Sequence, residues 1–339
     1  MKVFELTRAL VDIESITGNE EAAGNYLFDC LGALAARFQG SVERMPVEAG
    51  RFNVFAQFGD RPTVTLSTHM DTVPPFIASS EDDAHIWGRG ACDTKAIIAA
   101  MIAAAEGLLE SGKRDFGLLF VVGEERNSAG AYAAARTPRG SRYIVNGEPT
   151  ENKLALGSKG TLRYEVAAHG KMAHSAYPEL GDSAINKLLD ALARILRIAL
   201  PTDPLLGAST LNIGTLTGGR APNIIADEAH AEIMIRLVGD SESTKKALAA
   251  AVEGRAELRE VLEIPAVRLG SLDGIETTVV AFTTDIPAFG GKWGQPFLIG
   301  PGSIHVAHTL EERVPKAEVL EAIGIYKKMV RQLCKRESK

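Results

Sequence analysis

The first 157 residues alternate between helical and extended patterns. Apolar residues recur at helical spacing over 3–14 and 20–38, and a long alanine-rich helix is predicted from Thr94. Among the strand-like runs, FGLLFVV (116–122) is continuously apolar and RYIVN (142–146) is mostly so. The other elements predicted here are the strands NVFAQF and PTVTLST and a short helix over 128–136. Because strands buried on both faces have this composition, the pattern predicts an α/β fold with an open, mostly parallel sheet flanked by helices.

The pattern changes between about 158 and 267. The predicted order there is strand, helix, strand, strand, helix, strand, beginning with TLRYEVAAHG and including AHAEIMIRL, in which apolar and polar residues alternate. This is the order of a ferredoxin-like β-α-β-β-α-β unit, which can fold as a small domain. A strand PFLIG and a helix from Lys316 then return to the first pattern. We therefore expect one domain formed by 1–157 plus 268–339, with a second domain, 158–267, inserted into it.

Composition narrows the class of protein. The 339 residues are 45% hydrophobic and 24% charged with a net charge of -6, which gives no basic surface for nucleic acid. The longest apolar run, AIIAAMIAAA from Ala96, is about half the length that spans a bilayer, and the first residues lack a secretory-signal pattern. Three widely spaced cysteines favour a reducing compartment. We expect a cytoplasmic protein with no nucleic-acid or membrane partner.

Polar side chains with metal-binding chemistry follow the predicted strands directly. In an open parallel sheet, ligands bind at the carboxyl ends of the strands. The residues at these ends are His69 and Asp71, Glu124 and Glu125, Glu148, and His305 and His308, while Asp93 opens the long helix. Imidazoles and carboxylates that converge in this way predict a centre of two divalent metals that share a carboxylate and activate water.

Several of these residues also have a simpler explanation. Asp93 stands where an N-cap would satisfy the first turn of the helix. Glu148 fits a turn, and His169 and His174 of the inserted domain fit ordinary surface positions. Cys92 resembles a ligand, but no second cysteine is near and the set is rich in carboxylates, so we expect no thiolate ligand.

The adjacent polar pairs indicate a division of roles. Of two neighbouring glutamates, one can bind metal while the other, which points elsewhere, acts as general base. His69 would bind metal through one ring nitrogen. We expect the Asp71 carboxylate to accept a hydrogen bond from the other ring nitrogen and so to fix the tautomer.

Seven segments, in this order, resemble one enzyme family: STHMDTVP, WGRGACDTK, GEERNSAGA, NGEPT, GKMAHSAYPELGDSAI, GGRAPNIIADEAHAEIMIR and GPGSIHVAHTLEE. Over nearly its whole length the chain resembles the co-catalytic zinc amidohydrolases that include acetylornithine deacetylase, succinyl-diaminopimelate desuccinylase, aminoacylase and glutamate carboxypeptidase. The resemblance implies a zinc-exopeptidase-like catalytic domain and an inserted domain that serves as lid and dimerisation surface. It also implies a homodimer and two Zn²⁺ ions, for which Co²⁺ can substitute.

The resemblance assigns the metal ligands and the base. His69 and Glu148 would hold one zinc, Glu125 and His308 the other, and Asp93 would bridge both, with Glu124 as general base. The family motif places the last ligand within AHTLEE, which selects His308 over His305.

Further roles fall outside the metal ligands. His174 corresponds to a lid histidine that, in family dimers, reaches the active site of the partner subunit and stabilises the oxyanion. Asn223 and Arg236 correspond to lid residues that contact the substrate and would hold its α-carboxylate. Asp285 matches a segment near the site and is taken as a further substrate contact.

The substrate expected from the resemblance is a small N-acyl amino acid. GEPT and AHTLEE are most similar to acetylornithine deacetylases, which predicts deacetylation of N-acetylornithine or a close analogue, within arginine biosynthesis. A desuccinylase and a small-substrate carboxypeptidase or dipeptidase of the same family stay open, as does a metal-free relative that serves as a binding or assembly module. The chain departs from many relatives at Ala96, Ile97 and Gly123, which bears on substrate choice and removes no ligand.

Overall fold

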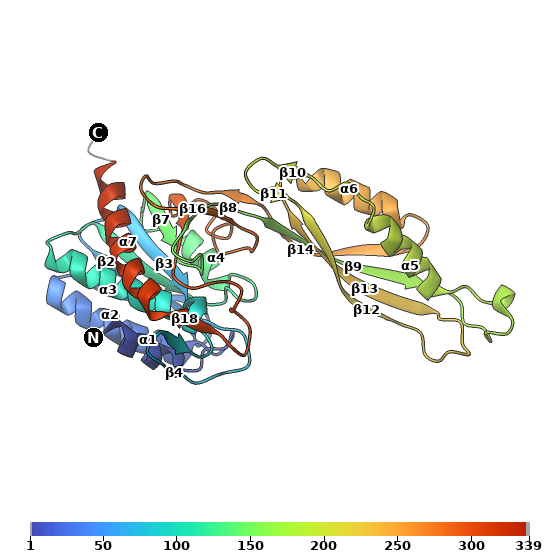
Figure 1. Ribbon diagram of the computed structural model, residues 1–339, viewed down its shortest axis with the longest axis horizontal. Coiled ribbons are helices and arrows are strands. Elements are labelled where there is room, and N and C mark those ends of the chain that lie inside the picture. Colours follow the sequence, from blue (N-terminus) through green and yellow to red (C-terminus); the bar gives the residue numbers. More distant parts are fainter. Residues whose placement is uncertain (1, 337–339) are drawn as a thin grey trace. The chain divides into compact units, whose positions relative to one another are not determined.

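The computed structural model describes residues 2–336, which form two compact units (Figure 1). The larger unit comprises the described residues up to Leu156, Leu269–Thr278, and those from Thr284 onward. The smaller unit comprises Gly157–Arg268 and Val279–Thr283. The second of these segments, a short return of the chain to the smaller unit, is not apparent in the sequence pattern.

A mixed sheet forms the centre of the larger unit. Its strands are β1 (Ser41–Glu48), β2 (Arg51–Phe58), β6 (Phe116–Val121), β3 (Val64–His69), β7 (Tyr143–Asn146) and β17 (Gln295–Leu298), in that spatial order. Strands β6, β3, β7 and β17 run parallel to one another, whereas β1 and β2 add an antiparallel edge. Every residue of β3 and β6 is buried, as the apolar composition of β6 predicts.

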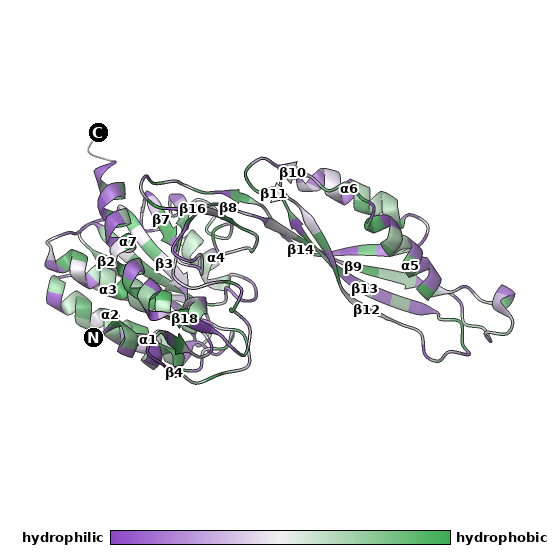
Figure 2. Cartoon of the chain, viewed as in Figure 1, coloured by the Kyte–Doolittle hydropathy of each residue, from purple (hydrophilic) through white to green (hydrophobic). Residues whose placement is uncertain are grey.

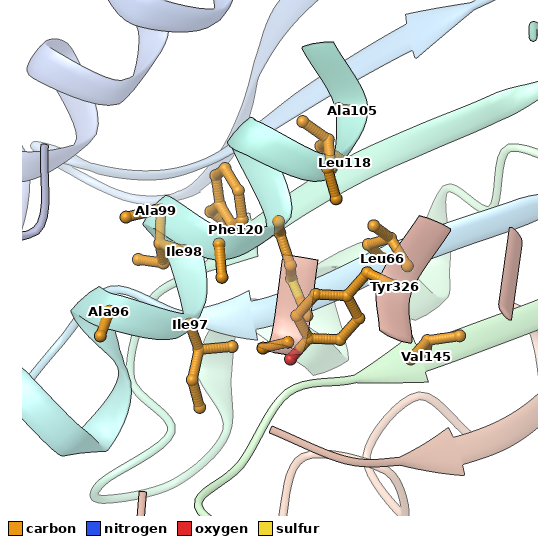
Figure 3. Close-up of a cluster of buried hydrophobic side chains, with 14 of the residues drawn as sticks. Leu66, Ala96, Ile97, Ile98, Ala99, Ala105, Leu118, Phe120, Val145 and Tyr326 are labelled. Carbon is orange, nitrogen blue, oxygen red and sulfur yellow. The ribbon is translucent and has the colours of Figure 1, made fainter. Parts of the chain in front are cut away.

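Helices flank this sheet. They are α1 (Val3–Val11), α2 (Glu21–Phe38), α3 (Ala96–Glu110), α4 (Ala129–Arg136) and α7 (Lys316–Lys335). Figure 3 shows the core where side chains of α3, including Ile97, meet Leu66 of β3, Phe120 of β6 and Tyr326 of α7. The arrangement confirms the predicted α/β class. None of the helices in residues 2–336 has the length and apolar composition needed to cross a membrane.

The smaller unit contains an antiparallel sheet and two helices. Its elements in chain order are β9 (Gly160–His169), α5 (Ala184–Ile195), β12 (Thr210–Gly218), β13 (Glu228–Leu237), α6 (Ser241–Val252) and β14 (Glu257–Ile264), and the sheet order is β12-β13-β9-β14. This is the predicted β-α-β-β-α-β order. Buried and more exposed residues alternate along β9 and β13, and Figure 2 shows the same alternation in hydropathy. The buried face forms one core with Leu188 of α5 and Leu248 of α6.

The remaining helices, strands and turns of the described chain are short. A small sheet contains β4 (Ser80–Glu81), β5 (His85–Trp87) and β18 (Arg313–Pro315), and another contains β8 (Leu154–Ser158), β15 (Val267–Arg268) and β16 (Thr277–Val280). The pair β10 (Thr202–Asp203) and β11 (Gly207–Ala208), the 3-10 turn Pro178–Leu180 and the π-type turn Ala91–Lys95 complete the set of elements in the described chain. The last of these turns carries Asp93.

Candidate metal centre

Two groups of potential metal ligands lie together in the larger unit. The first consists of His69, Asp93 and Glu148, which are all buried. His69 is the last residue of β3 and Glu148 follows the end of β7, so both lie at the carboxyl ends of neighbouring parallel strands. Nε2 of His69 lies 3.0 Å from Oδ1 of Asp93 and 4.0 Å from Oε2 of Glu148.

Asp93 also belongs to the second group, with Glu125 and His308. Nε2 of His308 lies 3.3 Å from Oδ2 of Asp93 and 3.0 Å from Oε1 of Glu125. Within each group the ligand atoms all lie within 4.8 Å of one another. Oδ1 of Asp93 thus faces His69, and Oδ2 faces His308. This arrangement suits a carboxylate shared by two metal ions.

The backbone before α3 explains how Asp93 reaches both groups. The helix begins at Ala96, and Lys95 occupies its N-cap position without a capping side-chain bond. Asp93 and Thr94 have non-helical angles inside the preceding turn, with φ -122° and ψ 84° at Asp93. The alternative explanation, that Asp93 caps the helix, is therefore wrong, and its carboxylate is available to the histidines.

The chemistry of the two groups fits divalent metal ions. Imidazole nitrogen and carboxylate oxygen are ligands that Zn²⁺ and similar ions accept. Burial raises the pKa of Glu148 well above its ordinary value and also raises the pKa of Glu125. Within residues 2–336, the ion-pair partners found for Asp93, Glu125 and Glu148 are the histidines alone. Since buried carboxylates need compensating charge, bound cations would supply what the protein leaves unbalanced.

The ring of His69 is oriented by Asp71, although not through the carboxylate as predicted. Nδ1 of His69 lies 2.9 Å from the backbone oxygen of Asp71 but 3.6 Å from its carboxylate Oδ1. A carbonyl oxygen can only accept a hydrogen bond, so Nδ1 donates and carries the proton. The lone pair of Nε2 then faces Asp93 and Glu148. The acceptor that fixes the His69 tautomer is therefore the backbone oxygen of Asp71, and not its carboxylate as predicted.

The carboxylate of Asp71 instead holds the turn that carries the two glutamates. It accepts hydrogen bonds from the backbone nitrogens of Glu124 at 3.1 Å and Glu125 at 3.2 Å, and from Oγ1 of Thr17 at 2.8 Å. These donors are the physical reason why the carboxylate is not closer to the imidazole. No local sequence pattern marks Thr17, because its contact with Asp71 spans 54 positions of the chain.

Glu124 belongs to neither ligand group found among the described residues. It follows Gly123, whose φ of +81° favours glycine and starts the turn. Burial raises the pKa of Glu124 well above its ordinary value, and the charge of Glu148 adds to this rise. A buried carboxyl group that holds its proton more readily than usual, and that belongs to neither ligand group, is suited to transfer a proton.

Three other candidates lie outside both groups in the described chain. His305 is exposed, and Cys92 is buried with its Sγ 3.4 Å from the backbone oxygen of Ser303. Asp285 is only 1% exposed, and its Oδ1 has no hydrogen-bond partner within residues 2–336. Burial raises the pKa of Asp285 to about 7. Its contact with a substrate stays a prediction.

His174 and Asn223 are neighbours in the smaller unit. The backbone nitrogen of Ser175 donates to the oxygen of Asn223 at 3.0 Å, and His174 forms a β-bridge with Ile224. The exposed ring of His174 accepts a hydrogen bond at Nδ1 from the nitrogen of Ala176 at 3.1 Å. In the neutral ring the proton is therefore on Nε2, which can donate to a ligand. An open cavity of about 790 Å³ borders these segments.

Arg236 lies apart from these two residues. Asn223 precedes the start of β13, whereas Arg236 is next to its end. A strand of this length spans roughly 30 Å at about 3.3 Å per residue. The guanidinium of Arg236 donates from Nη1 to Oγ1 of Thr161 at 2.8 Å. Asn223 and Arg236 of one chain are therefore too far apart to hold the same small carboxylate, and their contact with the substrate stays a prediction.

Comparison with known proteins identifies the family. The sequence pattern described as "Peptidase family M20/M25/M40" matches residues 65–332, a range that includes both ligand groups. The chain belongs to this family. As an M20 family member it is a metal-dependent hydrolase, similar to carboxypeptidases and dipeptidases.

Relatives of this M20 family member extend over nearly the whole chain. A peptidase M20 domain-containing protein of Schizosaccharomyces pombe is 38% identical over 97% of this chain and 84% of its own. An Aspergillus fumigatus protein named "Probable carboxypeptidase" is 37% identical over 95% of this chain and 84% of its own. These names support the family and a peptidase-like activity, and they give no support to acetylornithine as the specific substrate.

Solved structures show that the M20 family member shares its fold with peptidases. A tripeptidase from Staphylococcus aureus has a TM-score of 0.83 at 23% identity and covers 97% of this chain and 98% of its own. An M20 family metallo-carboxypeptidase from Sulfolobus solfataricus has a TM-score of 0.78 at 16% identity and covers 98% of this chain and 99% of its own. The architecture of the chain and its similarity to these solved structures both confirm the predicted fold class.

Proposed function

We propose that the chain is a two-metal hydrolase that cleaves an amide bond whose leaving group is an amino acid with a free α-carboxylate. N-acyl amino acids such as N-acetylornithine contain this bond, and so do dipeptides and other short peptides. The names of the relatives favour the peptides. The observation that carries the proposal is the position of Asp93 between two ligand groups, with Glu124 outside both.

In this proposal His69 and Glu148 would hold one Zn²⁺, Glu125 and His308 would hold the other, and Asp93 would serve both. Bound metal ions of this kind lower the pKa of water and polarise an acyl oxygen. The protein prepares the ligands by fixing Nε2 of His69 as the free lone pair, through the bond from Nδ1 to the backbone of Asp71.

Glu124 moves the proton in the proposed reaction. Its carboxylate takes a proton from the attacking water and returns it to the leaving amine, which needs one to depart. Burial raises the pKa of Glu124, so the group holds a proton more readily than an exposed glutamate does, which supports the return of the proton to the amine. The backbone nitrogen of Glu124 donates a hydrogen bond to the Asp71 carboxylate, which keeps Glu124 in place while this occurs.

His174 is the proposed donor to the developing oxyanion. Its Nδ1 is occupied as an acceptor, so Nε2–H is available without a change of tautomer. Preorganised donors of this kind stabilise charge that develops in the transition state.

We further propose a homodimer formed through β12. This edge strand carries no charged residue, and Leu216 on it is 53% exposed. The opposite edge, β14, carries Glu257, Arg259, Glu260 and Glu263, and charged edges resist strand pairing. A dimer would also let Asn223 of one chain and Arg236 of its partner serve a single site, which one chain cannot do.

We propose a cytoplasmic location on the basis of the cysteines. Cys30 and Cys92 form no disulfide within residues 2–336. Unpaired cysteines of this kind are typical of a reducing compartment.

A substrate panel tests the function. The purified chain, stripped with chelator and reloaded with Zn²⁺ or Co²⁺, is assayed on N-acetylornithine, N-succinyl-diaminopimelate, dipeptides and tripeptides, each beside its C-amidated analogue. We expect turnover only with the free carboxylate, lost on chelation and restored by either metal. Activity that survives with the metal shown to be absent would overturn the proposal. Failure of the protein to bind stoichiometric metal would favour the metal-free assembly module instead.

A further inference from the structure

Glu312 lies against the backbone of the turn that carries Asp93. It is 2% exposed and directly precedes β18. Its Oε1 accepts hydrogen bonds from the backbone nitrogens of Gly90 at 2.9 Å, Cys92 at 3.2 Å and Asp93 at 3.1 Å. A single carboxylate oxygen thus satisfies three buried donors that no helix or sheet pairing would otherwise reach.

Arg89 compensates the charge of Glu312. Arg89 is also 2% exposed, and its Nη1 lies 2.5 Å from Oε2 of Glu312. The main chains are joined as well, because the nitrogen of Gly88 donates to the backbone oxygen of Glu312 at 3.1 Å. A buried ion pair contributes little stability beyond what well-packed apolar side chains would. The value of this pair therefore lies in the geometry that it fixes.

The geometry points to Glu312 as a positioning residue that holds Asp93 where two metal ions can share it. Glu312 belongs to neither ligand group in the described chain, and it acts through the backbone. Its own segment also carries His308, so one stretch of chain supplies a ligand of the second group and the anchor for the shared carboxylate. Without Glu312, the backbone nitrogen of Asp93 would have no acceptor, and the non-helical backbone angles of Asp93 would lose this support. The consequence for metal binding rests on the proposed function, but the anchoring itself does not.

Amide hydrogen exchange on the metal-free protein tests the anchoring. Glu312→Gln keeps the shape of the side chain but places an NH₂ group against either the backbone donors or Arg89. We expect exchange in the peptide covering 88–95 to accelerate about tenfold or more, with exchange in β6 unchanged. Glu311→Gln is the matched control, since the Glu311 side chain is 84% exposed. Unchanged exchange at 88–95, or equal acceleration in β6, would overturn the inference.

Metal binding tests the consequence separately from turnover. Partners that orient metal ligands typically contribute about 10- to 100-fold in metal affinity. We expect Glu312→Gln to weaken Zn²⁺ binding in titration calorimetry by this factor and to alter the visible spectrum of the Co²⁺-loaded protein, while Glu311→Gln changes neither. If Glu312→Gln does not fold, Glu312→Asp, which keeps the charge but shortens the reach, serves in its place. Loss of folding in both variants would show a global role and would overturn the local one. If none of the substrates in the panel is turned over, but Glu312→Gln accelerates exchange at 88–95 as expected, the result would count against the proposed function alone.

Discussion

The carboxylate of Asp71 accepts a hydrogen bond from the backbone nitrogen of Glu124 at 3.1 Å. The same residue accepts a bond from His69 through its main-chain oxygen. Two neighbouring parallel strands, β3 and β6, lead to these segments, so Asp71 joins the end of one strand to the turn after the other. The main-chain and side-chain oxygens of Asp71 therefore have different tasks, and a substitution can separate them.

Asp71→Asn should lower kcat by roughly tenfold or more with zinc content unchanged, since small misplacement of a catalytic group is costly. The Asn amide nitrogen cannot accept from the turn, while the backbone oxygen still holds His69. Turnover and metal analysis on the same sample measure the two effects. Thr17→Val, which removes a donor to this carboxylate but leaves the turn bonded, should have a smaller effect. Parallel loss of zinc and activity in Asp71→Asn would show that Asp71 acts through His69.

Glu124→Gln should retain both metal ions while turnover falls about 100-fold or more, because general acid–base catalysis typically contributes that much. Glu125→Gln is the matched comparison, since Oε1 of Glu125 lies 3.0 Å from His308 in a ligand group. This second variant should lose metal as well as activity. Equal metal loss in the two variants would contradict the division of roles between the adjacent glutamates.

A mixture of two inactive proteins should recover activity if the site is shared between chains. We expect His174→Ala and Glu124→Gln, each inactive alone, to regain up to about a quarter of wild-type activity after subunit exchange, because two-fold dimers form statistically. Activity without exchange of subunits, or a fully active monomer in sedimentation, would rule out the shared site. A mixture of His174→Ala with itself is the control.

The strand pattern predicts the ligands better than it predicts their supports. The strands β3 and β7 are both located by the sequence pattern, and the polar residues at their ends, His69 and Glu148, come together as expected. The geometry of these ligands agrees with the expectation, while their assignment to metal stays a prediction. Strand β1 is not apparent, because its residues are largely exposed at an edge and include Pro46.

Supports such as Thr17 and Glu312 depend on contacts between distant segments. Glu312 is 219 positions from Asp93 in the chain, and no local pattern marks it. The orientation of the Asp71 carboxylate also depends on the folded turn, and periodicity carries no information about it.

Gly147→Ala should lower the free energy of unfolding by about 1–3 kcal/mol, as overpacking of a core does. A Cβ atom at Gly147 would lie 2.4 Å from Cγ2 of Ile97. The same Cβ atom would lie 2.7 Å from Cε of Met101, so two side chains of α3 fill the space beside Gly147. In an Ile97→Ala background the same substitution should cost less, which urea denaturation of the four proteins measures. An equal cost in both backgrounds would mean that Ile97 is not the obstacle.

Leu216→Lys should weaken the proposed dimer at least about tenfold, because a lysine on an edge strand opposes pairing. Leu262→Lys on β14 is the matched control, with an exposed leucine on the other edge of the same sheet. Sedimentation across a range of concentrations measures both dissociation constants. Equal weakening by the two substitutions would exclude β12 as the specific interface.

The charges on β14 also decide how far strand pairing can proceed. A sheet with two receptive edges adds copies at both sides and grows into a filament, whereas a sheet with one receptive edge stops at two chains. Glu260 and Glu263 contact Lys245 of α6, and Arg259 contacts Glu165 of β9, so the charges on this edge are held in place. If the chains pair through β12 as proposed, these charges would protect the protein against self-propagating polymerisation at high concentration, and neutralising β14 would remove that protection without altering either metal-ligand group.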